Sequence, residues 1–298
     1  MASPYCDMNR KALSFCMAIA LSPCICPAAR QGSMLFYPTA MKTGANLLEK
    51  ATWHEPPAKH APHAVAGREK GGPLDADAPA MTLGNAHPEY AYWQALAGGV
   101  RPGRTYLMGV WAKIENAKLL FWCKGSHAES EKKFDVRVYC NSGCSPILEG
   151  YFDDDVKRRL SGDPDEWRFI ARTFTVAEAL ALDVLNVEFG FAKAPGKATF
   201  AEPVLIDVTD QPQTLEIELR GVKPVKRLVA IRLDTRDPVW HREFDAPVTD
   251  FSETMKAASP AFHGMGADPV SGHALLVYYA DRTEDRVSCP AEGLYLKR

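Results

Sequence analysis

Residues 100–114, V-R-P-G-R-T-Y-L-M-G-V-W-A-K-I, constrain the fold more than any other part of the sequence. The segment begins with a Pro102-Gly103 turn, because proline pre-sets φ and glycine tolerates a positive φ. Tyr106 and every second residue after it fall on one face of the extended run that follows, and Leu107 and its alternates fall on the other. Both faces are largely apolar, which is typical of a strand buried between two layers. The segment therefore predicts a central strand of a β-sandwich.

Short extended runs of this kind recur along the chain, and glycine, proline and asparagine turns separate them. Many short strands, regular turns and few helical patterns indicate an all-β fold. The runs of the first set are residues 91–96, 105–114, 118–123, 134–140, 147–152, 166–176, 185–192 and 199–208. Those of the second set are residues 215–219, 225–233, 239–244, 273–280 and 294–297. Single helical turns fit residues 177–182 and 252–258.

Composition divides the chain into segments. Residues 31–45 lack periodicity and read as a tether, and residues 46–210 form the first β domain. Residues 55–80 within it have almost no large apolar side chains, so they read as an exposed insertion whose histidines are solvated bystanders. Residues 213–298 suffice for a small sandwich of immunoglobulin-like size.

The N-terminal residues 1–30 have the pattern of a secretory signal peptide. Asn9-Arg10-Lys11 is positive, an apolar run covers residues 12–21, and small residues follow at 26–29. A short buried helix is the alternative. The pattern predicts export, to the periplasm, the cell envelope or the medium, with no membrane span in the mature chain.

Four cysteines lie beyond the expected signal peptide: Cys123, Cys140, Cys144 and Cys289. Disulfides are expected in an oxidising compartment, and four cysteines allow three pairings. The C-N-S-G-C turn favours a Cys140–Cys144 bridge. A zinc site is the alternative, but the C-x3-C spacing has no second close pair and no nearby histidines.

Net charge and short motifs limit the classes of partner and reaction that the sequence favours. The 298 residues have a net charge of −2, so neither nucleic acid nor an anionic membrane is favoured as a partner. The chain has no G-x-S-x-G elbow, no phosphate-binding glycine loop and no H-E-x-x-H pair. A glycosidase needs two carboxylates across a pocket, and no motif singles out such a pair. Catalysis is left open, and a monomer is expected.

Four stretches in the first β domain resemble the jelly-roll carbohydrate-binding modules of the cellulose- and xylan-binding type, which share the galactose-binding-like fold. Their order along the chain is that of the family. They are N-L-L at 46–48 with Trp53, the polar strand and Pro-Gly turn leading to Y-x-x-x-x-W-x-K within 93–113, E-W through F-T-V at 166–176, and the closing strand 196–208. The resemblance implies a jelly-roll β-sandwich, followed here by the smaller immunoglobulin-like β-sandwich.

The resemblance also implies a structural calcium ion. In the family this ion joins an acid after the opening aromatic residue to the closing aspartate. Asp207 matches the closing position, whereas His54 follows Trp53 and Glu55 comes one residue late. Asp207 and Glu55 are therefore the candidate metal ligands, and both offer the oxygen atoms that calcium prefers.

A glycan-binding site needs aromatic rings for the C–H faces of sugars and polar side chains for their hydroxyls. Trp122 and Tyr139 are expected on adjacent strands of the concave face, and core packing is the alternative for any one aromatic residue. The preferred set is Trp122, Tyr139, Tyr92, Gln94, Arg137 and Glu149, and the further aromatic candidates are Tyr90, Trp93, Tyr151 and Phe152.

Three functions follow from these residues. The first is an exported, non-catalytic carbohydrate-binding protein that holds a polysaccharide or glycoconjugate on the jelly roll. The second is a structural or adhesion protein of the cell envelope that contacts protein. The third is a glycan-active hydrolase or lyase with a dispersed active site.

Overall fold

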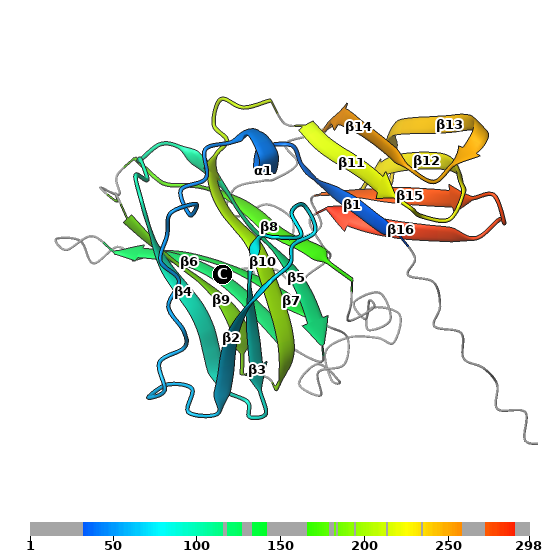
Figure 1. The fold of residues 1–298 in the computed structure, drawn as a ribbon. Coiled ribbons are helices and arrows are strands. Elements are labelled where there is room, and N and C mark those ends of the chain that lie inside the picture. Colours follow the sequence, from blue (N-terminus) through cyan, green and yellow to red (C-terminus); the bar gives the residue numbers. More distant parts are fainter. Residues whose placement is uncertain are drawn as a thin grey trace, which may run out of the picture. The chain divides into compact units, whose positions relative to one another are not determined.

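The computed structural model describes residues 32–115, 118–126, 133–141, 166–178, 182, 184–193, 195–212, 214–233, 235–257 and 272–289. These residues form sixteen strands, β1 to β16, and one short helix, α1, Ala40–Thr43. The strands make four sheets, so the all-β prediction is confirmed (Figure 1). Within the described residues, no helix has the length and apolar character needed to cross a membrane.

Nine strands form a jelly-roll sandwich. One sheet has the order β2-β3-β10-β5-β8 and the other has the order β4-β9-β6-β7. The chain passes repeatedly from one sheet to the other, and both sheets contribute to one apolar core. The strands are β2 Ala64–Lys70, β3 Pro79–Asn85, β4 Tyr90–Gly98, β5 Thr105–Glu115, β6 Lys118–Ser126, β7 Lys133–Asn141, β8 Arg168–Thr175, β9 Val184–Ala192 and β10 Gly196–Asp207.

Strand β5 is the central strand that residues 100–114 predict. It pairs with β10 on one side and with β8 on the other. Tyr106 and Met108 face the jelly-roll core, whereas Leu107 and Trp111 belong to a second apolar cluster. Two different cores therefore bury its two faces, which explains why both faces are apolar.

Seven strands form a second, smaller sandwich of the immunoglobulin-like size. Its sheets have the orders β1-β11-β14 and β13-β12-β15-β16. Its apolar cluster also includes Trp111 and Phe169 of the jelly roll, and the rings of Tyr37 and Trp111 meet edge to face at 5.7 Å. The strands are β1 Ser33–Pro38, β11 Thr214–Arg220, β12 Val225–Arg232, β13 Pro238–Val248, β14 Phe251–Lys256, β15 His273–Tyr279 and β16 Glu284–Cys289.

The expected tether at residues 31–45 is wrong, because strand β1 lies inside it. β1 pairs antiparallel with β11, and Leu35, Phe36 and Tyr37 are all buried. Because these buried residues are consecutive, the sequence shows a short apolar run without the alternation typical of a strand. Such a run does not distinguish a strand from an irregular segment. The second sandwich therefore starts at β1, and the jelly roll is inserted between its first two strands.

Other expectations need correction or lie outside the described residues. The exposed insertion at 55–80 contains β2, an edge strand whose residues are exposed or half-buried. The helical turn expected at 252–258 is wrong over residues 252–256, which belong to β14. This strand pairs with β11 and buries Met255. The expected strands at 147–152 and 294–297 and the signal peptide at 1–30 lie outside the described residues, as do residues 179–181 of the helical turn expected at 177–182.

Cys123 and Cys289 are buried in separate cores as thiols, so no disulfide joins this described pair. Burial raises the pKa of the Cys289 thiol well above its ordinary value. The favoured Cys140–Cys144 bridge is outside what the structure describes, because Cys144 lies beyond the described residues and only the backbone of Cys140 is placed.

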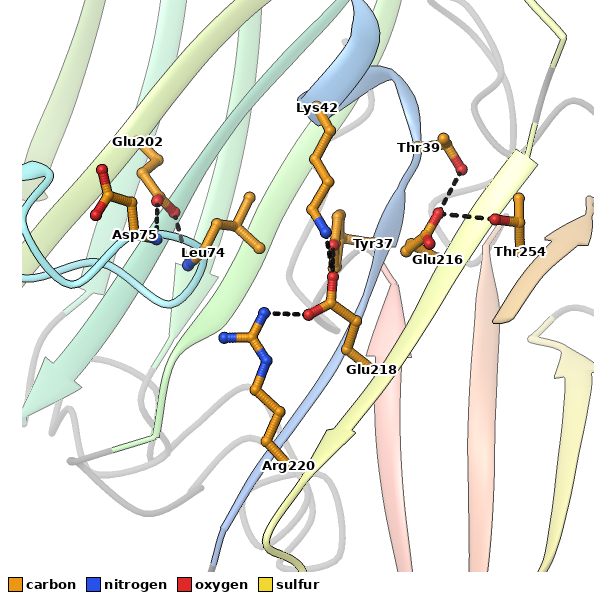
Figure 2. A network of polar contacts seen from close by, with 10 residues as sticks. All are labelled: Tyr37, Thr39, Lys42, Leu74, Asp75, Glu202, Glu216, Glu218, Arg220 and Thr254. Carbon is orange, nitrogen blue, oxygen red and sulfur yellow. Dashed lines mark hydrogen bonds and ion pairs between the residues drawn. The ribbon is translucent and has the colours of Figure 1, made fainter. Parts of the chain in front are cut away.

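A polar network joins the chain segments that enter and leave the jelly roll (Figure 2). The carboxylate of Glu218 on β11 is almost fully buried and accepts hydrogen bonds from Tyr37 on β1, Lys42 on α1 and Arg220. Burial by itself would raise the pKa of Glu218, but these three donors hold it at about 2. The network therefore ties β1 and α1 to β11 at the base of the insertion.

Candidate functional site

A cleft of about 940 Å³ lies on the sheet β4-β9-β6-β7. The strand residues that line it alternate with core residues such as Trp93, Phe121 and Phe189, so the cleft is on the face opposite the jelly-roll core. The segments before β2 and before β4 complete its rim. The cleft is lined by Pro57, Lys59, His60, Pro88, Glu89, Tyr90, Tyr92, Gln94, Leu120, Trp122, Lys124, Asn186, Glu188 and Lys193.

Strand register aligns the lining residues in rows across the sheet. Gln94 on β4 pairs with Glu188 on β9, which also pairs with Trp122 on β6. In the next row, Gly190 of β9 lies between Tyr92 and Leu120. Residues paired in this way project from the same face of a sheet. The rows therefore bring side chains from three strands to one surface.

Aromatic side chains form a strip along this surface. Leu120 is buried beneath Tyr92 and Trp122, which pack against it. The ring centroids of Tyr92 and Trp122 are 6.4 Å apart, and those of Tyr90 and Tyr92 are 5.8 Å apart. Tyr90 is 41% exposed although it is a large apolar side chain. The aromatic strip, defined as Tyr90, Tyr92 and Trp122, therefore runs from the floor of the cleft to its rim.

A buried carboxylate and a half-buried lysine form an ion pair beside the aromatic strip. Glu188 is 4% exposed, and its Oε1 accepts from Lys124 Nζ at 2.6 Å and from Asn186 Nδ2 at 2.9 Å. The Lys124 ammonium is also 4.2 Å from the centroid of the Trp122 ring. A buried carboxylate is costly unless a cation compensates it. Glu188 therefore holds the Lys124 ammonium against the indole.

The rim has its own polar contacts. The imidazole Nδ1 of His63 lies 2.6 Å from Oε1 of Glu89, and this hydrogen bond lowers the pKa of Glu89. The backbone N–H of Lys193 donates to the carbonyl oxygen of Glu89 at 3.1 Å. The Lys193 ammonium lies 5.2 Å from the centroid of the Tyr90 ring. These contacts join the segment before β4 to the end of β9.

The structure brings four of the residues that the sequence singles out to one cleft: Tyr90, Tyr92, Gln94 and Trp122. Trp93, a further candidate, is buried in the jelly-roll core. Arg137 and Tyr139 lie on β7, where the backbone register places them opposite Trp122 and Leu120.

Glu149 lies outside the described residues. Sequence reasoning did not select Lys124, Asn186 or Lys193, and it treated His60 as a solvated bystander. The sequence of β9 could have indicated its cleft residues, because the run L-N-V-E-F-G-F from residue 185 alternates and places polar or small residues on one face.

The two candidate calcium ligands have different surroundings. The carboxylate of Asp207 accepts from Arg104 Nε at 2.8 Å and from the backbone N–H of Thr209 at 3.0 Å. Burial opposes ionisation of Asp207, but Arg104 and Thr209 lower its pKa. Glu55 is exposed on the segment after Trp53. A guanidinium therefore already neutralises the carboxylate of Asp207.

Metal ligands are not grouped in the part of the chain that the structure describes. No three histidine, cysteine, aspartate or glutamate side chains lie there in a group that could hold an ion. Calcium binding stays a prediction of the resemblance.

Comparison with known proteins gives matches among solved structures only. No protein-family model matches the sequence, and no curated protein matches it. A structure described as "CBM4 structure and function" is 15% identical, covering 52% of this chain and 86% of its own, with a TM-score of 0.33. The CBM22-1 xylan-binding domain from Paenibacillus barcinonensis Xyn10C is 9% identical, covering 61% of this chain and 99% of its own, with a TM-score of 0.36.

A third match is TmCBM61 in complex with β-1,4-galactotriose. It is 9% identical and covers 56% of this chain and 93% of its own, with a TM-score of 0.31. All three are carbohydrate-binding modules of the class that the motif order resembles. Scores of this size add no argument about function, and the identification of the jelly-roll sandwich depends on its strand order.

Proposed function

We propose that the protein binds a glycan in the cleft on sheet β4-β9-β6-β7. The observation that carries the proposal is the aromatic strip beside Gln94 and Asn186 in one open cleft. Sugar rings have apolar C–H faces that pack on aromatic side chains, and their hydroxyls need amide and charged partners. This combination of side chains matches both needs.

The size of the strip indicates an oligosaccharide rather than a single sugar. Tyr90 and Trp122 lie two strands apart, and the register separates them by four residues along the strand direction. The ring centroids are 5.8 Å apart from Tyr90 to Tyr92 and 6.4 Å apart from Tyr92 to Trp122. The strip therefore suits a short oligosaccharide.

Binding rather than turnover is the function that the cleft supports best. Its two carboxylates, Glu89 and Glu188, are both engaged by basic side chains. The hydrogen bond from His63 lowers the pKa of Glu89, which is opposite to the shift that a general acid needs. Export, expected from residues 1–30, would bring the cleft to extracellular polysaccharides.

The test is binding of the full chain to a panel of soluble and insoluble polysaccharides, with Trp122→Ala as the main variant. A half-buried indole contributes on the order of 2 kcal/mol of apolar contact, so we expect binding to weaken about tenfold or more. Tyr278→Ala is the control, because Tyr278 is a half-buried aromatic residue of the second sandwich, on β15. Its binding should equal that of the wild type.

Other outcomes would contradict the proposal. If the wild-type chain is retained on no polysaccharide but captures an envelope protein, an adhesion function replaces glycan binding. If reducing sugar or an unsaturated product is released, the protein is a glycan-active enzyme. Retained binding in folded Trp122→Ala would remove the aromatic strip from the site.

A further inference from the structure

Basic side chains outnumber acidic side chains in the cleft. Three lysines line it, Lys59, Lys124 and Lys193, and only two carboxylates do, Glu89 and Glu188. His60 adds a side chain that becomes cationic when protonated. The cleft is therefore more basic than the chain as a whole, whose net charge is −2.

Two of these lysines, Lys59 and Lys193, are not part of the ion pairs among the described residues of the cleft. Lys124 pairs with Glu188 at 2.6 Å, and Glu89 pairs with His63 at 2.6 Å. Lys59 and Lys193 are exposed, and neither has a carboxylate partner in the described part of the chain. Two ammonium groups at the cleft are thus available to a ligand.

Lys193 is held at the cleft by its backbone. Its φ is 53°, a left-handed conformation that non-glycine residues seldom adopt. The hydrogen bond from its N–H to Glu89 O stabilises this conformation and directs the residue toward the aromatic strip. Strained backbone of this kind persists where the surrounding structure holds it, and it clusters at binding sites.

We propose that the glycan is anionic and that its uronate carboxylates bind Lys193 and Lys59. This inference rests on the proposed glycan-binding function. In a uronic acid the carboxylate projects from the edge of the sugar ring. The Lys193 ammonium lies over the Tyr90 ring. A sugar that stacks on this face displaces the ammonium toward the carboxylate at the edge of the sugar, so that a cation–π contact is exchanged for an ion pair.

The experiment compares binding of the full chain to polygalacturonate and alginate with binding to neutral β-1,4-galactan and xylan. Dextran sulfate serves as a polyanion without uronate. We expect tighter binding to the uronates, with affinity falling as NaCl rises from about 0.05 M to about 0.5 M because salt screens exposed charges. Lys59→Gln and Lys193→Gln should each weaken uronate binding about two- to fivefold. Lys256→Gln, which changes an exposed lysine on β14, should not.

The outcomes separate this inference from the glycan-binding function. If neutral galactan or xylan binds as tightly as the uronates, and Lys193→Gln leaves uronate binding unchanged, the anionic preference is wrong and glycan binding stands. If dextran sulfate binds as tightly as the uronates and Trp122→Ala weakens neither, charge alone is responsible, and the uronate site is refuted. If no polysaccharide binds, the glycan-binding function itself fails.

Discussion

Replacing Glu218 by glutamine tests how the second sandwich is held to the entry of the jelly roll. Glutamine keeps the shape of the side chain but removes the charge that Lys42 and Arg220 face. It leaves two cations beside a neutral amide, and Tyr37 loses a charged acceptor. We expect a folded but less stable protein.

The magnitude follows from the pKa of Glu218, which is about 2 in place of the usual 4.5. A shift of this size corresponds to about 3 kcal/mol of differential stabilisation of the charged form. The side chains of Lys42 and Arg220 are 43% and 50% exposed, so solvent screening reduces the effect. An expected loss of about 2–3 kcal/mol at pH 7 corresponds to a fall in Tm of roughly 3–5 °C for a chain of this length.

The pH dependence has a definite sign. The folded-state pKa is below the unfolded value, so the contribution of Glu218 is complete above about pH 5 and is lost as pH falls toward about 2. Thermal unfolding of the wild type and of Glu218→Gln between these pH values measures it. The difference in Tm between them should shrink as pH falls, and other carboxylates cancel in that difference.

Glu216→Gln is the matched control. Glu216 lies two residues away on β11, and among the described residues its carboxylate accepts only from the hydroxyls of Thr39 and Thr254. The Tm of Glu216→Gln should fall by less than that of Glu218→Gln. A Glu218→Gln protein with wild-type Tm at pH 7, or with a pH-independent difference, would refute the reasoning.

Two further predictions concern the cleft and the candidate calcium site. A Cβ added at Gly190 would lie 1.9 Å from Ala91 O, so Gly190→Ala should displace β4, lower stability by about 1–3 kcal/mol and weaken glycan binding. Gly84→Ala is the control, because the nearest atom to its added Cβ is 3.9 Å away, and it should change neither stability nor binding. Calorimetry and the polysaccharide panel check both variants. Because Arg104 already neutralises Asp207, a chelator should leave the Tm of the wild type unchanged, and Arg104→Gln should lower it. A chelator-induced fall in the wild type that calcium restores would show that the ion binds after all.

The sequence predicts those strands in which the order of apolar and polar residues shows which faces are buried. Strand β5 is recognisable because its two apolar faces and its Pro-Gly turn occur in consecutive residues. Tyr92, Gln94 and Trp122 are predictable for the same reason, since each alternates with core residues of its own strand.

Other features depend on contacts between segments that are far apart in the sequence, which a local pattern does not predict. β1 is a strand because β11, far along the chain, supplies its hydrogen-bond partners. His60 lines the cleft because of the path of a segment that has no periodicity of its own. The Glu188–Lys124 pair needs the register between β9 and β6, which sequence periodicity leaves open.

The insertion of the jelly roll between β1 and β11 also sets an order of folding. During synthesis β1 emerges first, but Tyr37 must wait for Glu218, 181 residues later. Once the jelly roll folds, Asn46 binds the backbone of Pro203 and Leu205, which brings its entry and exit together.

That closure replaces a long loop with a short one and lowers the entropic cost of pairing β1 with β11 by about 2–3 kcal/mol. We therefore expect β1 to pair with β11 only after the jelly roll has folded, and damage to the jelly roll to destabilise the sheet that contains this pair.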